Sequence, residues 1–172
     1  GASTSKNSLP TKTTWPNSTP SNPRPSPHSR SIVLIGLDSA GKSTILYQLT
    51  LSRFVVTIPT SDFLSVTFPH NGHLFRLIDI GGSPTPRKKW PTHASAADGI
   101  IFVVDASSSP SQFALAAVEL EKVRAGPAGK VPIVVFANMQ DREGARSAGA
   151  VSAALGRSAG GGAPRMVVPC CA

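Results

Sequence analysis

Residues 36–43 have the composition of a loop that binds phosphate groups. They read Gly-Leu-Asp-Ser-Ala-Gly-Lys-Ser and match the pattern GxxxxGK[ST]. Glycine lets backbone N–H groups surround an anion without side-chain clashes, and a helix that starts just after the loop adds partial positive charge. Lys42 can reach the β- and γ-phosphates of a nucleotide, while the Ser43 hydroxyl can bind Mg²⁺. We therefore expect phosphate contacts from Asp38, Ser39, Ala40, Gly41, Lys42, Ser43 and Thr44.

Two further segments could complete a site for Mg²⁺ and a γ-phosphate. Asp79 follows an apolar run and begins the sequence Asp-Ile-Gly-Gly. Its carboxylate can join the Mg²⁺ ligands, and the N–H of Gly81 or Gly82 can contact a γ-phosphate. Thr60, in Thr-Ile-Pro-Thr, offers a hydroxyl as another Mg²⁺ ligand. Asp-Gly turns and loop threonines are common by themselves, so both expectations depend on the phosphate loop.

The segment Asn138-Met-Gln-Asp141 follows another apolar run and could recognise a base. A carboxylate at Asp141 can accept the hydrogens that guanine presents on N1 and N2, whereas adenine presents a different donor pattern. This difference favours GTP or GDP over ATP. A polar loop without a ligand is the simpler alternative, and a P-loop ATPase or kinase stays open as a remote one.

The elements that must position these residues alternate between strands and helices. Short apolar runs rich in β-branched residues predict strands buried on both faces, and Asn71-Gly72 predicts a hairpin turn. Ser109 and Pro110 predict the start of a helix that Gly126 ends. Further helices are expected at 42–49 and 150–155, and strands at 31–35, 63–68, 73–80, 99–105, 131–136 and 166–168. This order predicts an α/β fold, a mostly parallel doubly wound sheet with one antiparallel hairpin strand.

Composition divides the 172 residues into a tail and one domain. Residues 1–30 contain six Pro, seven Ser and five Thr, with four basic and no acidic residues, and are expected to be disordered. Residues 31–172 form the expected domain. The formal net charge of +8 leaves phosphate ligands, nucleic acid and anionic membranes open. No signature of a specific nucleic-acid binder is present.

Other classes of protein are disfavoured by simple features. The apolar runs are too short to span a bilayer, and the first residues lack the apolar stretch of a secretory signal. Cys170 and Cys171 are adjacent, which makes a disulfide framework implausible and points to a reducing, cytoplasmic setting. The four histidines lack metal-ligand spacing and are expected to be ordinary surface residues.

With these motifs in order, the chain resembles the ADP-ribosylation-factor (Arf/Arl) family of small GTPases. The resemblance runs from about Ile32 to Ala172 with almost no gaps, and the Leu-Asp-x-Ala inside the phosphate loop is its most specific part. Its other matching segments are Thr57–Thr60, Asp79–Gly82, Arg87, Trp90, Gly99–Asp105, Val135–Asp141 and Cys171-Ala172. The resemblance implies a P-loop small-GTPase fold and a monomer that binds GTP or GDP with Mg²⁺.

The resemblance also implies partners and residue roles. Effectors, exchange factors and GTPase-activating proteins would be the partners, in membrane traffic on the Golgi or other endomembranes. Thr60 would belong to a first nucleotide-sensitive segment and Asp79–Trp90 to a second. The catalytic positions would be Lys42, Thr60, Gly82 and Ser83, and the residues beside the guanine Asn138, Met139, Asp141, Cys171 and Ala172.

Several residues depart from the family pattern. Ser83 stands where the family has a glutamine that orients the attacking water, and serine is too short for that task. Pro84, Pro86 and Pro91 remove donors and break helix in the second segment. Met139 replaces a lysine but can still cover the base. The aromatic cluster of the effector face is reduced to Phe63, with Ile78 and His93 at the other positions.

We therefore expect a GTP hydrolase with a low intrinsic rate. The first alternative is a hydrolysis-deficient GTP-binding scaffold. A second is a non-functional fragment, because a helix that should follow the last strand is missing from residues 31–172. Membrane attachment stays open: Gly1-Ala-Ser-Thr-Ser5 matches a myristoylation pattern and equally a cloning scar, and Arg87-Lys88-Lys89 could contact an acidic partner or headgroup.

Overall fold

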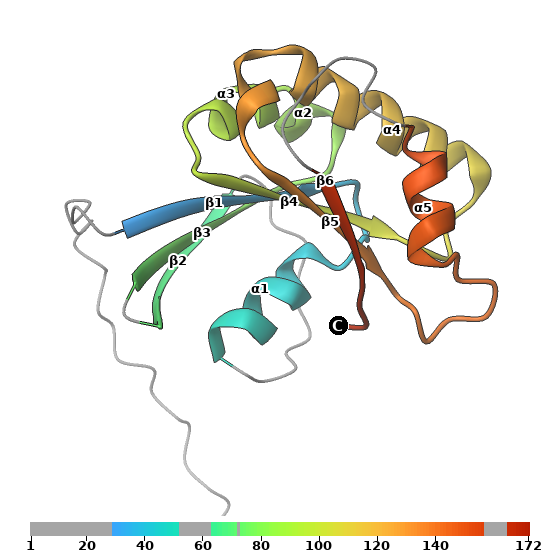
Figure 1. Cartoon of the computed structure of the whole chain (residues 1–172), viewed down its shortest axis with the longest axis horizontal. Helices are drawn as coiled ribbons and strands as arrows, with labels where there is room; N and C mark the ends of the chain where they lie inside the picture. The colour runs from blue at the N-terminus through green and yellow to red at the C-terminus, as the bar shows by residue number, and fades with distance from the viewer. Residues whose placement is uncertain (1–28, 52–62, 72, 157–164) are drawn as a thin grey trace, which may run out of the picture.

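The computed structural model describes residues 29–51, 63–71, 73–156 and 165–172 (Figure 1). Their six strands form one sheet in the order β2-β3-β1-β4-β5-β6, in which every neighbouring pair is parallel except the antiparallel pair β2 and β3. The strands are β1 (Ser29–Gly36), β2 (Phe63–His70), β3 (His73–Ile80), β4 (Gly99–Asp105), β5 (Ile133–Asn138) and β6 (Arg165–Pro169). This sheet confirms the predicted fold class.

Helices cover both faces of the sheet. One face carries α1, and the other carries the helices that follow β3, β4 and β5 (Figure 1). The helices are α1 (Lys42–Leu51), α2 (Pro84–Arg87), α3 (Trp90–Ser95), α4 (Pro110–Ala125) and α5 (Ala148–Ala154), with a 3₁₀ turn, η1 (Pro127–Lys130). None of the helices in the described segments is both long and apolar enough to cross a bilayer.

Two apolar clusters hold these layers together. Side chains alternate between faces along a strand, so Val33 and Ile35 of β1 pack toward α3–α5 while Leu34 packs toward α1. This double burial explains why the central strands are continuous apolar runs. The α1 face is less covered, because Ile101 and Phe136 are half-buried there and Met166 of β6 is 63% exposed.

The first residues of two strands, β1 and β5, differ from the predictions by two positions. β1 begins at Ser29 rather than residue 31, and Arg30 forms an ion pair with Asp98. β5 begins two residues later than expected and extends to Asn138, because Pro132 has no N–H for a sheet ladder. Residues 1–28 lie outside the described part, so the disordered tail stays a prediction.

The proline-rich segment after β3 is helical in two short pieces. Pro84 and Pro91 lie in the first turns of α2 and α3, where a backbone N–H needs no partner within the helix. Lys88 and Lys89 separate the two helices. The segment is therefore two short helices, each of which begins with a proline in its first turn.

Candidate functional site

The predicted phosphate loop is a turn between the carboxyl end of β1 and the start of α1. Gly36 has φ +152°, and a Cβ there would overlap the carbonyl group of Val103 on the neighbouring strand. Gly41 has φ +91°, and its Cβ would overlap the amide of Asn138. Both motif glycines are therefore required by backbone angle and by space. The loop leads directly into the first turn of α1, and the N-terminus of a helix is an arrangement that binds anions.

Lys42 lies at the first position of α1 and is 7% exposed. Its Nζ donates a hydrogen bond to the carbonyl oxygen of Leu37 at 3.0 Å. Burial lowers the pKa of Lys42, and the nearby carboxylate of Asp79 opposes that shift. The loop thus holds a poorly solvated ammonium group, which an anionic ligand would stabilise.

Asp79 and Ser43 form the candidate Mg²⁺ site. The Ser43 hydroxyl donates to Oδ2 of Asp79 at 2.5 Å, and the Asp79 side chain is fully buried. Oδ1 of Asp79 has no hydrogen-bond partner among the described residues. A hydroxyl beside a carboxylate with an unused oxygen suits a hard cation such as Mg²⁺. The third predicted ligand, Thr60, lies outside the described residues.

Asp79 has a raised pKa because burial penalises its carboxylate, although the Ser43 hydrogen bond and the charge of Lys42 act in the opposite direction. A folded-state pKa above the unfolded value means that the carboxylate destabilises the ligand-free fold at neutral pH and does not at acid pH. We expect Asp79→Asn to raise the unfolding free energy of metal-free protein near neutral pH. The gain should shrink as the pH falls toward about 4.

Urea unfolding in the presence of a chelator measures this effect. Asp98→Asn is the matched control, because Asp98 is an exposed partner of Arg30. A gain from Asp79→Asn that is equal at both pH values, or a loss at neutral pH, would contradict the assigned burial cost.

The segment that follows β3 packs directly against the phosphate loop. A Cβ on Gly82 would overlap the backbone of Leu37 and Asp38, so only glycine fits this approach. The indole Nε1 of Trp90 donates to the carbonyl oxygen of Gly81 at 3.1 Å and fixes the position of α3 against the same turn. Ser83 is half-buried at the N-cap of α2, and its side chain makes no capping hydrogen bond.

Asn138 connects the phosphate loop to the end of the chain. Its Nδ2 donates to the carbonyl oxygen of Ala40 at 3.0 Å. Its Oδ1 accepts the N–H of Ala172 at 3.1 Å and the Cys170 thiol at 3.6 Å. The side chain is fully buried. The sequence pattern predicts that Asn138 lies beside the base. It does not predict the hydrogen bond to Ala40, because the two residues are 98 positions apart and no local pattern relates them.

The remaining predicted base-binding residues lie around Asn138. Met139 has a left-handed backbone (φ +62°), and the end of its side chain lies over Gly41. A hydrogen bond from the Cys171 thiol lowers the pKa of Asp141 and raises that of Cys171. Asp141 is exposed, so its carboxylate is ionised and available to a donor. Residues far apart in sequence therefore converge beside the phosphate loop.

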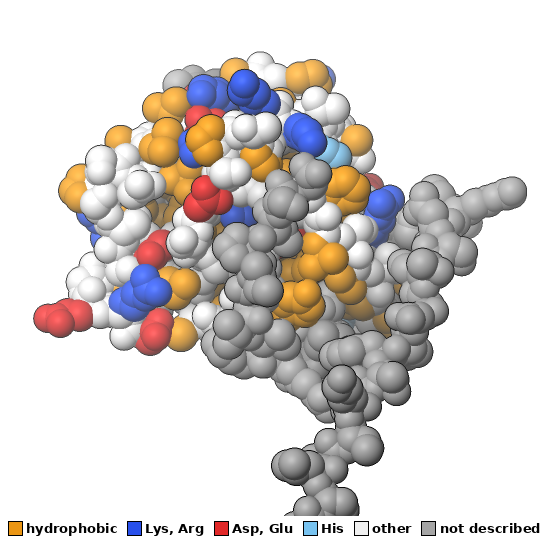
Figure 2. Space-filling view, turned by 180° about the vertical axis from the view of Figure 1, so that it is seen from behind, with side chains coloured by type: hydrophobic (Ala, Val, Ile, Leu, Met, Phe, Trp, Pro, Cys, Tyr) orange, Lys and Arg blue, Asp and Glu red, His pale blue; other side chains and the backbone are white. Residues whose placement is uncertain are grey.

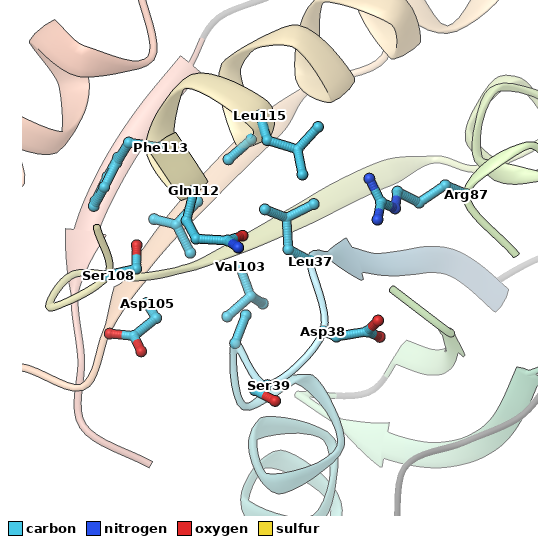
Figure 3. Close-up of a pocket in the computed structure, with 13 residues that line it drawn as sticks. Leu37, Asp38, Ser39, Arg87, Val103, Asp105, Ser108, Gln112, Phe113 and Leu115 are labelled. Carbon is cyan, nitrogen blue, oxygen red and sulfur yellow. The ribbon is translucent and has the colours of Figure 1, made fainter. Parts of the chain in front are cut away.

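A cavity of about 400 Å³ is lined in part by the phosphate loop (Figure 3). It runs between Leu37–Ala40, the end of β4 and the first turns of α4, and Arg87 lies at its margin. It contains none of Lys42, Ser43, Asp79 or Asn138. Nothing in the sequence pattern signals this cavity, since it arises from the packing of three separate elements.

The fold and the site together define a P-loop protein of the small-GTPase class. More narrowly, the chain belongs to the ADP-ribosylation factor family, whose sequence model matches residues 24–172. It is 39% identical to ADP-ribosylation factor-like protein 4D of Homo sapiens over 137 residues, which cover 75% of this chain and 68% of that protein. It is 38% identical to ADP-ribosylation factor 3 of Arabidopsis thaliana over 125 residues, covering 72% and 68%.

Solved structures agree with this assignment. The structure of the Arl6 (BBS3) small GTPase from Trypanosoma brucei, with the nucleotide analogue GppNp bound, aligns with a TM-score of 0.74 and 26% identity, covering 83% of this chain and 87% of that one. The mammalian SRP receptor aligns with a TM-score of 0.72 at 18% identity, a likeness of fold alone. The resemblance predicted from the motifs is confirmed.

Proposed function

We propose that this chain binds GTP and GDP with Mg²⁺ as a regulatory switch of slow intrinsic turnover. The observation that carries the proposal is the Asn138 side chain, which joins the phosphate loop at Ala40 to the predicted guanine side at Ala172. Membership of the Arf family supports the GTP-binding switch. The proposed slow turnover follows from Ser83, and the proposed role in membrane traffic follows from the resemblance to the Arf family.

The chain's own residues divide the binding task. Lys42 exchanges its contact with the Leu37 carbonyl for nucleotide phosphate oxygens, which relieves the cost of its burial. Ser43 and Asp79 would hold Mg²⁺, which supplies positive charge against the phosphates. Gly82 lies against the loop where a γ-phosphate contact would form. Asp141 accepts donors from the base.

The nucleotide released by denaturing purified protein tests this proposal. We expect chromatography to identify GDP or GTP, and ATP to fail in competition against labelled GDP. A bound adenine nucleotide would favour the P-loop ATPase alternative, and a chain that binds no nucleotide would favour the non-functional fragment.

Asp141 should determine the base. Asn at this position replaces one acceptor oxygen with a donor, so we expect Asp141→Asn to weaken GDP binding by about tenfold or more and to favour xanthosine diphosphate, whose C2 carries an oxygen. Competition binding with both diphosphates measures the change. Unchanged preference for GDP would remove Asp141 from base recognition.

Ser83 should limit hydrolysis. The serine side chain is shorter than the glutamine side chain that the family pattern has at this position. It therefore cannot hold the attacking water in line with the γ-phosphate. We expect Ser83→Gln to raise the single-turnover rate of phosphate release about tenfold or more, and Ser83→Ala to leave the rate unchanged. A rate equal in all three proteins would show that another feature limits turnover.

The hydrolysis-deficient scaffold is the second candidate function, and Ser83 is the residue that favours it. A GTPase-activating partner that accelerates single turnover supports the switch, while GTP that stays intact under every condition supports the scaffold. The switch and the scaffold would bind GTP at the same site, so GTP should raise the melting temperature in either case. A non-functional chain should show no such rise. A hundredfold excess of ligand over its Kd adds about 2.7 kcal/mol to stability.

We also propose a monomer that binds effectors, exchange factors and GTPase-activating proteins and has peripheral contact with Golgi or other endomembranes. In the described structure, the exposed Phe63 ring lies 6.2 Å from the His93 ring, centroid to centroid. These are two of the positions that the resemblance places on the effector face. Co-sedimentation with vesicles tests the membrane contact.

A further inference from the structure

A groove of about 250 Å³ separates the short helices α2 and α3 from α4. We call it the α2–α4 groove. Its walls include Pro84, Lys88 and Pro91 on one side and Lys122 and Val123 on the other. It lies on the face of the sheet that α3, α4 and α5 cover, and none of its lining residues is assigned to nucleotide or Mg²⁺ binding. Figure 2 shows Lys and Arg side chains at the end of the molecule that these helices form.

The charge of the α2–α4 groove is positive. Lys88 is exposed, and the side chain of Lys122 is 61% exposed on the opposite wall. The side chain of Glu119 is only 12% exposed, and its Oε1 lies 2.9 Å from Lys122 Nζ and 3.7 Å from an Arg87 guanidinium nitrogen. One largely buried carboxylate is therefore shared by two cations, and it leaves uncompensated positive charge at the mouth of the groove.

Half of the residues that line the α2–α4 groove are apolar, and two of these are prolines. Pro84, Pro91 and Val123 form apolar parts of the walls, and the fully buried Trp90 also lines the groove. Proline rings lose little entropy on binding, because their backbone is already restricted. A flat, charged membrane surface would use the lysines but not this recess. A chain segment that inserts an apolar side chain and places carboxylates on both rims would use both.

The α2–α4 groove is connected to the phosphate loop through Trp90. This fully buried residue of the groove lining donates its indole hydrogen to Gly81. The next residue, Gly82, packs on the backbone of Leu37 and Asp38. A shift of the Gly81–Gly82 turn would therefore move Trp90 and the α3 wall.

We propose that the α2–α4 groove binds an acidic protein segment that carries one apolar side chain. The apolar side chain enters between Pro91 and Val123, and flanking carboxylates pair with Lys88 and Lys122. The choice of an acidic partner stands on the groove alone. Dependence of its affinity on the bound nucleotide rests on the proposed function.

A synthetic peptide series tests the proposal by fluorescence anisotropy with the full chain. The probe has a central Leu flanked by Asp and Glu, and its controls carry Ala at the centre or Asn and Gln in place of the acids. We expect the probe to bind, each control to lose about tenfold or more in affinity, and added salt to weaken binding. Equal binding of all three peptides, or none, would overturn the proposal.

Two variants place the peptide in the α2–α4 groove. We expect Lys88→Glu to weaken probe binding about tenfold and Lys122→Gln about threefold. Lys130→Glu is the matched control, because Lys130 is exposed and does not line the groove, and it should change affinity less than about twofold. Melting temperatures of all variants report whether the fold is retained. If a variant unfolds, the comparison is made with the unaltered chain. There, the unlabelled peptide that carries Asn and Gln should displace the labelled probe about tenfold less well than the unlabelled acidic peptide does.

Vesicles containing acidic lipids supply the opposing outcome. Binding to vesicles that Lys88→Glu abolishes, without binding of the peptide, would assign the surface to a membrane and overturn the proposal. GDP retention is measured in the same samples. Peptide failure with GDP bound refutes the groove assignment alone, whereas peptide binding without any GDP or GTP binding refutes the proposed function alone.

Discussion

Lys42→Met is expected to lower the affinity for GDP and GTP by roughly thirty- to 150-fold, or about 2–3 kcal/mol, because it removes a charge-assisted contact to phosphate. The same substitution should stabilise the ligand-free fold. Burial lowers the pKa of Lys42, so its ammonium form destabilises the folded state at neutral pH, and this cost disappears as the pH rises toward the unfolded value. Methionine has similar length without the charge.

Calorimetric titration and chemical unfolding measure the two effects on the same samples. The unfolding difference between Lys42→Met and the unaltered chain should be largest near neutral pH and smaller in alkali. Lys122→Met is the matched control, since Lys122 is exposed and distant in sequence from the loop; it should leave nucleotide affinity unchanged. Retained affinity in Lys42→Met would refute the assigned phosphate loop.

Asn138→Ala is expected to lower both stability and nucleotide affinity. It removes the partner of the buried Ala40 carbonyl and of the half-buried Ala172 N–H. Unsatisfied buried polar groups cost about 1–3 kcal/mol each, so we expect a loss of about 2–4 kcal/mol in unfolding free energy. Affinity should fall about tenfold or more, because the phosphate loop and the base side are no longer held together.

Gln140→Ala is the control for this substitution. Gln140 also uses its amide to bind backbone carbonyls, those of Ala137 and Arg146, but it does not touch the phosphate loop. It should lose stability with little change in affinity. If Asn138→Ala and Gln140→Ala change nucleotide affinity equally, Asn138 has no special role in joining the two halves of the site.

Local sequence signals predicted the elements that local physics determines. The hairpin turn residue Asn71 has the left-handed backbone (φ +47°) that such turns require. The N–H of Gln112 donates to the Ser109 hydroxyl at 3.3 Å, as expected of the predicted N-cap of α4. Continuous apolar runs became the central strands, and the phosphate loop followed from its glycines.

Features that join distant segments had no comparable signal. Asn138 reaches Ala40 across 98 residues, and Glu119 of α4 is enclosed by Arg87 from another helix. Both are polar residues whose types predict exposure, and only tertiary packing buries them. The α2–α4 groove likewise depends on how two proline-started helices pack against α4. Thr60, by contrast, was predicted from its motif and stays a prediction.

Isothermal titration calorimetry of the full chain with GDP, in the presence of Mg²⁺, measures whether the phosphate loop binds a guanine nucleotide. We expect one binding event per chain, weakened by a chelator and by Lys42→Met, with ADP giving no comparable heat. Folded protein that binds neither GDP nor GTP under these conditions would contradict this expectation.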